Sequence, residues 1–100
     1  MPTFTLTLPH TLAPEEAAAR IRGFAGEIRV RYPEYAGEIR ESWEGNRARF
    51  EGTVMGFAIS GDIEAGRDAV RITVTYPFMA APFRGRIEAQ VRETIESLLT

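Results

Sequence analysis

Apolar and polar residues alternate over several short stretches of the chain, which is the pattern of strands with one buried face. Residues 3–8 alternate threonine with large apolar side chains, so every second side chain is expected to point into a core. The same alternation recurs at residues 39–43, 47–54, 57–64 and 70–76. Between residues 39–43 and residues 47–54, Gly45 and Asn46 supply a two-residue hairpin turn. Strands with one apolar face predict a mostly antiparallel sheet with its other face in water.

Two other stretches carry apolar residues at helical spacing. The first runs from Ala17 to Tyr32, with Pro14 in its first turn and Thr11 as the best available cap. Gly23 and Gly26 lie inside it, and we interpret them as tolerated within one helix. The second helix is expected to start at Pro82. Its apolar residues are Phe83, Ile87, Val91, Ile95 and Leu98.

The expected element order is therefore β-α-β-β-β-β-α. Each helix has a single apolar stripe, and the sheet has a single apolar face, so both helices should cover that face. This predicts an α+β two-layer sandwich, with a curved sheet and two helices on one side. One hundred residues without a linker or repeat indicate a single domain, residues 1–100.

Composition excludes several classes of protein. The chain has no cysteine, which rules out disulfides, thiolate metal sites and a cysteine nucleophile. A net charge of −2 without a basic stripe disfavours nucleic-acid binding. Residues 1–13 do not have the pattern of a signal peptide, and the longest apolar run, residues 76–83, is far shorter than the roughly 20 residues of a transmembrane segment. We expect a cytoplasmic protein without a transmembrane segment.

Three residues are candidates for a pocket or motif. His10, the only histidine, follows the first strand and could act as a general base, but we favour a turn residue that bonds to backbone. Glu41 lies on the apolar side of its strand, and we favour a carboxylate that reaches solvent or an arginine such as Arg22 or Arg29. Trp43 could line a pocket, although a lone inward tryptophan is more often core. No catalytic residue, metal site or cofactor is expected.

Residues 76–83 form the least ordinary segment, because they are apolar yet connect a strand to a helix. In one interpretation they are a packed corner of the core. In the other, part of the segment is exposed and contacts a partner or an apolar surface. The residues that would make this contact are Tyr76, Phe78, Met79 and Phe83. The sequence favours neither interpretation.

Short strings along the whole chain resemble one bacterial family. They are Leu8-Pro9-His10-Thr11-Leu12, then Glu16-Ala17 and Arg20, Trp43-Glu44-Gly45-Asn46, Met55-Gly56, Tyr76-Pro77, Phe83 and Leu98-Leu99. This order is similar to that of the polyhydroxyalkanoic acid system family, small proteins linked to polyhydroxyalkanoate storage granules. Many relatives carry Asp in place of Asn46 and Leu in place of Tyr76. The resemblance implies a role around the granule rather than an enzyme, and it supplies no catalytic residues.

Three hypotheses follow, of which the first is preferred. The protein is a non-enzymatic accessory protein of the polyhydroxyalkanoate system that contacts the granule surface or granule proteins. Alternatively, it is a small carrier of apolar, lipid-like ligands with a reduced helix-grip fold, which requires an internal cavity of a few hundred Å³. An enzyme built on His10 or Glu41 ranks last. Because the sheet has free edges, a homodimer stays open.

Overall fold

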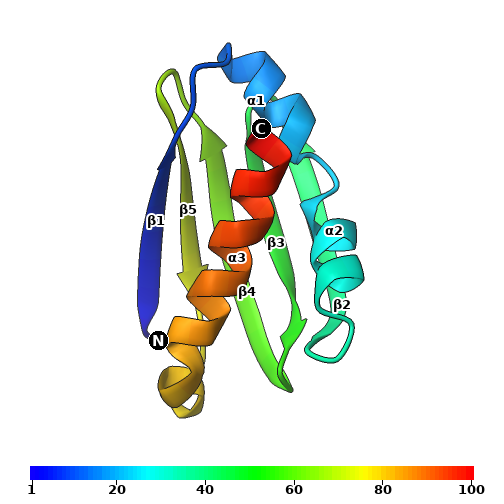
Figure 1. The fold of residues 1–100 in the computed structure, drawn as a ribbon. Helices are drawn as coiled ribbons and strands as arrows, with labels where there is room; N and C mark the ends of the chain where they lie inside the picture. Colours follow the sequence, from blue (N-terminus) through cyan, green and yellow to red (C-terminus); the bar gives the residue numbers. More distant parts are fainter.

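The computed structural model describes residues 1–100 as one antiparallel sheet with helices on one face (Figure 1). The strands are β1 (Thr3–Pro9), β2 (Ala36–Glu44), β3 (Arg47–Val54), β4 (Phe57–Ala65) and β5 (Ala69–Thr75). The helices are α1 (Pro14–Ile21), α2 (Phe24–Arg31), the 3₁₀ helix η1 (Phe78–Phe83) and α3 (Arg84–Leu99). The strand order is β1-β5-β4-β3-β2, and every neighbouring pair is antiparallel.

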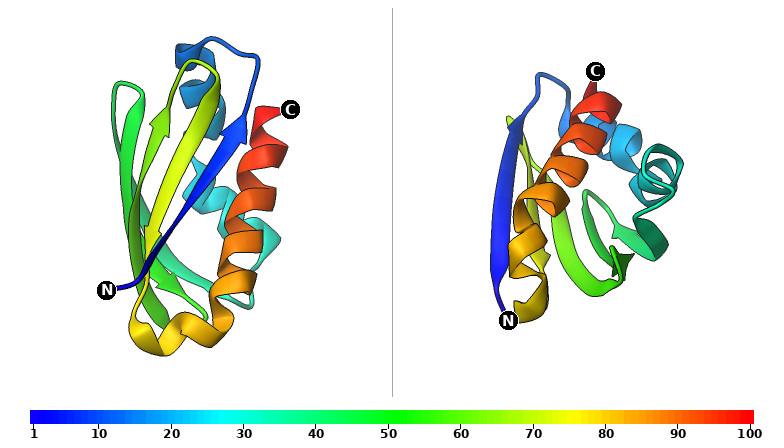
Figure 2. Two further views of the ribbon diagram at one scale, coloured as in Figure 1. Left: turned by 90° about the vertical axis from the view of Figure 1, so that its left-hand side faces the viewer. Right: turned by 60° about the horizontal axis from the view of Figure 1, so that its bottom comes forward.

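The predicted α+β two-layer sandwich is confirmed. Seen from the side of β1, the sheet and the helices form two separate layers (Figure 2). In β1, β3 and β5 most inward positions are buried and the alternate positions are more exposed, as the period-two pattern predicts. The apolar residues of the sheet and of the three α-helices join in one core of 24 buried residues.

The helical region after β1 differs from the prediction of one continuous helix. Gly23 adopts a left-handed conformation with φ of 94°, and this residue separates α1 from α2. Glycine adopts a left-handed conformation easily. Gly23 is therefore a break between two helices rather than a tolerated residue within one. The expected cap at Thr11 is also wrong, because Ala13 precedes the first turn and Pro14 starts it.

The C-terminal helix begins later than predicted. Pro82 lies inside η1, and α3 starts at Arg84. Proline fixes its own φ and lacks an N–H, so it fits a short 3₁₀ turn as well as the start of an α-helix. The sequence pattern did not distinguish these two conformations.

Glycines at inward strand positions make room for neighbouring groups. At Gly61 a side chain would collide with the ring of Phe50 and with the backbone of β5. Phe50 uses this space to meet Phe24 of α2 edge to face, with ring centroids 5.3 Å apart. Gly52 lies opposite a register shift in β2, where a side chain would strike the backbone of Ile39. The sheet can therefore bend around the helices at these glycines.

Candidate functional site: an apolar end of the molecule

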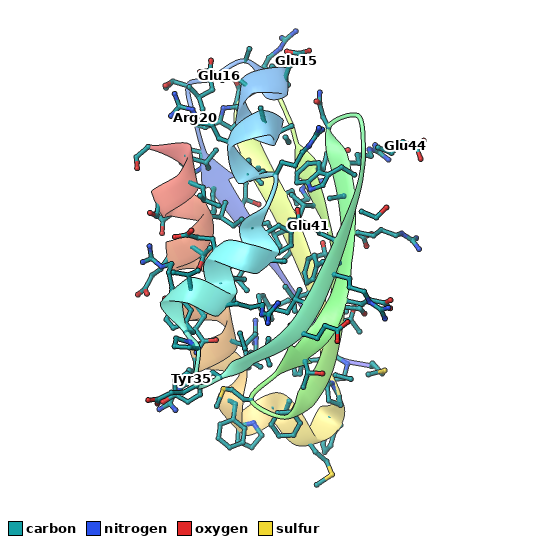
Figure 3. The ribbon with its side chains drawn as sticks, turned by 90° about the vertical axis from the view of Figure 1, so that its right-hand side faces the viewer. Glu15, Glu16, Arg20, Tyr35, Glu41 and Glu44 are labelled. Carbon is teal, nitrogen blue, oxygen red and sulfur yellow. The ribbon has the colours of Figure 1, made fainter.

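Glu41 is a structural carboxylate that holds the start of α2. One carboxylate oxygen accepts the backbone N–H of Gly23 at 2.9 Å, and the other accepts that of Ala25 at 3.1 Å. Figure 3 shows Glu41 between the helices and the sheet. Helix N-termini leave N–H groups without partners, and a carboxylate there is further favoured by the helix dipole. Glu41 thus caps a helix from a neighbouring strand, and it forms no ion pair with Arg22 or Arg29.

Trp43 belongs to the same cluster. Its indole N–H donates to Glu41 at 2.6 Å, and the guanidinium of Arg22 lies 5.4 Å from its ring centre. The side chain is half-buried and packs against the core. One face of the indole therefore lies against Arg22, and its N–H is bound to Glu41.

His10 connects two loops through its ring. Its Nε2 lies 2.9 Å from the carbonyl oxygen of Gly66, and Nδ1 accepts the backbone N–H of Leu12 at 3.1 Å. These contacts assign the proton to Nε2. The ring is fully used by backbone groups, which agrees with the interpretation of His10 as a turn residue. No cluster of three or more potential ligands could hold a metal ion.

The outer face of the sheet is polar and carries exposed ion pairs. They join Arg40 to Glu51, Arg47 to Glu64 and Arg49 to Asp62, across neighbouring strands. A shallow hollow on this face is lined almost entirely by polar residues. Exposed pairs of this kind contribute little to stability, and their mixed charge does not define a ligand.

The unusual surface lies at the end of the molecule where η1 leaves the sheet. The side chains of Phe78 and Met79 are 80% and 79% exposed, and Phe83 is 40% exposed. Aromatic and sulfur-containing side chains gather at this end, near Tyr35 (Figure 3). We call Phe78, Met79 and Phe83 the apolar end.

Tyr76 does not contribute to the apolar end. It is only 5% exposed, its ring packs 6.1 Å from that of Phe4, and its N–H donates to the carbonyl oxygen of Pro2. Ala80 is completely buried. The segment thus combines both sequence interpretations: Tyr76 and Ala80 anchor it to the core, and Phe78 and Met79 point into solvent.

Phe57 borders the apolar end, and Met55 lies in the turn before it. The sequence patterns did not single out Phe57, and Met55 was named only as part of the family resemblance. Phe57, at the start of β4, lies with its ring 5.7 Å from that of Phe83. Met55, in the β3–β4 turn, has a left-handed φ of 56°. That conformation costs a side-chain-bearing residue on the order of 1–2 kcal/mol. The signal in the sequence was the turn itself, where Asn, Asp or Gly would be usual before Gly56.

Comparison with known proteins places the chain in a family. The family model described as "Putative polyhydroxyalkanoic acid system protein (PHA_gran_rgn)" matches residues 5–99. The chain belongs to this family. Among curated proteins, none matches the sequence.

The fold of this family member is shared with a solved structure of very different sequence. The structure titled "Crystal structure of Ara h 8.0201" superposes with a TM-score of 0.51 at 8% identity, covering 97% of this chain and 94% of that one. At this identity the likeness shows the α+β fold and nothing more. No helix of the chain is long and apolar enough to cross a membrane.

The interior between the helices and the sheet is nearly full. The space there measures about 10 Å³, roughly the room of one water molecule. It is lined by eight apolar residues and by Gln90 of α3. The side chain of Gln90 is 5% exposed, and its Oε1 has no hydrogen-bond partner. The cavity of a few hundred Å³ expected for a carrier is therefore not present in this conformation.

Proposed function

We propose that the protein is a non-enzymatic accessory protein of the polyhydroxyalkanoate system whose apolar end binds the surface of the storage granule. The observation that carries the proposal is the exposure of Phe78 and Met79, two large apolar side chains adjacent in sequence. Membership in the family supplies the context. Burying a side chain of either kind gains about 1.5–3 kcal/mol, so these residues favour contact with an apolar surface.

The construction of the apolar end also supports a binding role. The buried side chains of Tyr76 and Ala80 fix η1 on both sides of the exposed pair, which limits the entropy that binding must spend. The left-handed Met55 lies in the neighbouring turn, and backbone strain of this kind often accompanies a functional surface. The carboxylate of Glu41, the indole N–H of Trp43 and both ring nitrogens of His10, in contrast, form hydrogen bonds within the protein.

A binding assay on isolated polyhydroxyalkanoate granules tests the proposal. The intact protein is compared with Phe78→Ser/Met79→Ser and with Val30→Ser, a control that changes a residue of similar exposure, 75%, on α2. The double variant should lose granule binding by on the order of 100-fold, from the apolar area removed. The control should bind as the intact protein does, and circular dichroism should show all three folded. Equal binding by the double variant and the intact protein would reject the apolar end as the contact.

Two binding surfaces, protein-free polymer particles and native granules, distinguish contact with the polymer from contact with a granule protein. We propose direct contact with the granule surface, so particles of purified polymer without protein should bind as well as native granules do. Binding to native granules alone would assign the partner to a granule protein instead. In a granule-forming cell, the fluorescently tagged protein should gather at granules in the cytoplasm, and a diffuse distribution would count against the proposal.

The second candidate function is an apolar-ligand carrier, favoured by one observation. Gln90 is buried among apolar residues with an unpartnered acceptor, so an apolar ligand with a hydroxyl group could supply the missing donor. The nearly full interior would first have to open. Titration with long-chain alcohols distinguishes the two candidate functions. A carrier should bind these alcohols at micromolar concentration, and its Gln90→Leu variant should bind them more weakly. The granule-binding proposal expects no such binding.

A further inference from the structure

The first strand forms an open edge of the sheet. β1 has β5 as its neighbour on one side only. Viewed from the side of β1, this strand lies in front, and no other segment covers its edge (Figure 2). The second edge of the sheet is β2, at the opposite side of the molecule (Figure 1).

The backbone groups along the open edge can be assigned from the hydrogen bonds that flank the ladder. Tyr76 donates its N–H to Pro2, and His10 donates its N–H to Asp68, both at 3.0 Å. In an antiparallel ladder every second residue exchanges hydrogen bonds with the neighbouring strand. The even-numbered residues of β1 therefore face β5. The N–H and C=O groups of Thr3, Thr5 and Thr7 point away from the sheet.

The two edges are protected to different degrees. β2 carries several charged side chains, and its register shifts between Ala36 and Ile39. Charges and bulges of this kind discourage pairing with another chain. β1 has no charged residue and pairs with β5 in continuous register over its whole length. An unbroken, uncharged edge strand is a template for a further strand.

We propose that β1 pairs antiparallel with β1 of a second copy of the chain, with Thr5 facing the partner's Thr5. In this register Thr3 faces the partner's Thr7, and each of the three threonines exchanges both of its free backbone groups. A shift of the two-fold axis to Leu6 places Thr3 opposite the partner's Pro9, which has no N–H to donate. Because β1 has no charged residue, the pairing places no like charges opposite each other on the two strands. The free groups are thus self-complementary in one register.

A second copy fits this edge better than an unrelated strand does. The two-fold axis stands perpendicular to the sheet, so the apolar inner faces of both copies lie on the same side. Phe4 then lies beside the partner's Leu6, and the exposed threonines pair on the outer face. Cross-strand pairs of these types are favourable, at roughly 0.2–1 kcal/mol each.

The pairing has a consequence that rests on the proposed function. η1 lies at the end of the molecule where β1 begins, since Tyr76 bonds to Pro2. Antiparallel pairing therefore directs the two apolar ends in opposite directions. A dimer of this form has two separate contact sites and can connect two apolar surfaces.

Cysteine cross-linking tests the register, because the chain contains no cysteine of its own. Directly opposed, hydrogen-bonded residues have Cα atoms about 5.5 Å apart, within the range that a disulfide spans. With oxidised glutathione as oxidant, Thr5→Cys should form a covalent dimer. Thr3→Cys alone should not, whereas an equal mixture of Thr3→Cys and Thr7→Cys should cross-link. Cross-linking of Thr3→Cys alone at the rate of Thr5→Cys would overturn the proposed register.

Sedimentation of the unmodified protein tests the dimer itself. The intact chain should sediment at twice its mass at high micromolar concentration, and Thr5→Pro should sediment as a monomer with an unchanged circular dichroism spectrum. Proline is tolerated there because the N–H of Thr5 does not face β5. Thr5→Ser is the matched control and should remain a dimer. An intact chain that stays monomeric at these concentrations would refute the pairing. Phe78→Ser/Met79→Ser should remain dimeric whether or not granule binding fails, so the two proposals fail separately.

Discussion

The Glu41 cluster and the apolar end use their side chains in opposite ways. At the Glu41 cluster, a carboxylate and an indole that resemble parts of an active site meet each other and the backbone of α2. At the apolar end, Phe78 and Met79 extend into solvent and contribute little to the core.

On this contrast we base the proposal that the Glu41 cluster is structural and that the apolar end is a contact surface. A polar side chain whose donors and acceptors are all satisfied within the protein has little capacity left for a substrate. An apolar side chain left in water has lost a possible gain in stability and is available to a partner. The four predictions below test this division, from the largest expected effect to the smallest.

Removal of the Glu41 carboxylate should strongly destabilise the fold. Glu41→Ala leaves two N–H groups of the α2 start and the indole N–H of Trp43 without a partner. We expect a loss of about 3 kcal/mol in the free energy of unfolding, from the lost charged hydrogen bonds and helix cap. Urea denaturation measures it. Glu41→Gln should lose less because the amide oxygen still accepts. Unchanged stability of Glu41→Ala, or loss of granule binding in the folded variant, would break the comparison.

His10→Ala should have a smaller effect of the same kind. The change removes the acceptor for Leu12 and the donor to Gly66, so we expect a loss of about 1–2 kcal/mol. His10→Asn is the control, since its amide can replace one of the two bonds. Granule binding of both variants should equal that of the intact protein, and a selective loss of binding would show that His10 has a role beyond the turn.

Phe83 should behave as an intermediate between the two regions. It is partly exposed, and its ring packs against Phe57. Phe83→Ser should therefore lower stability by about 1 kcal/mol, from the lost aromatic pair, and also weaken granule binding. Phe78→Ser should weaken binding without the change in stability. Thermal unfolding and the granule assay together measure both effects. If the two variants cannot be distinguished by stability, the division between anchored and free aromatic side chains is wrong.

The smallest effect is expected at the other end of α2, where Tyr32 donates its hydroxyl hydrogen to Glu93 at 2.7 Å. This hydrogen bond, with a lesser contribution from burial, raises the pKa of Tyr32 above its ordinary value of 10.0. The protonated phenol is the form that the fold favours, so its contribution to stability is full below pH 10.0 and is lost as the pH rises through the raised pKa.

Ultraviolet titration of tyrosinate checks this assignment. Glu93→Gln should lower the pKa of Tyr32 towards the ordinary value, and Tyr32→Phe identifies the signal of Tyr32 among the three tyrosines. Stability at neutral pH should fall by less than about 1 kcal/mol in either variant, as expected for one hydrogen bond near the surface. An unchanged titration curve in Glu93→Gln would contradict the assigned cause.

The sequence predicted the sheet better than it predicted the helices. Alternation over a few residues leaves little choice for a strand, because a shift by one residue would expose every apolar side chain. Helical periodicity, in contrast, continues across a break when the apolar stripe resumes on the same side. This is why the apolar spacing predicts Gly23 inside one helix, although it separates α1 from α2.

The candidate residues were found in the sequence, but apart from His10 their contacts were not. The sequence marks Glu41 and Trp43 as unusual, yet the cap that Glu41 forms depends on α2 lying against β2. Residues 76–83 were recognised as apolar, but the burial of Tyr76 and the exposure of Phe78 depend on how η1 turns at the sheet edge. Gln90 was not found at all, because a glutamine on a helix is ordinary until its surroundings are known.

The sequence by itself determined the strands, the two apolar faces and the resemblance to a family, since these depend on residue order over short distances. Only the tertiary structure decided which side chains are already satisfied and which are free. Hydrogen-bond partners such as Glu41 and Gly23, or His10 and Gly66, are distant along the chain. Burial, too, depends on packing between elements, and no local pattern contains that information.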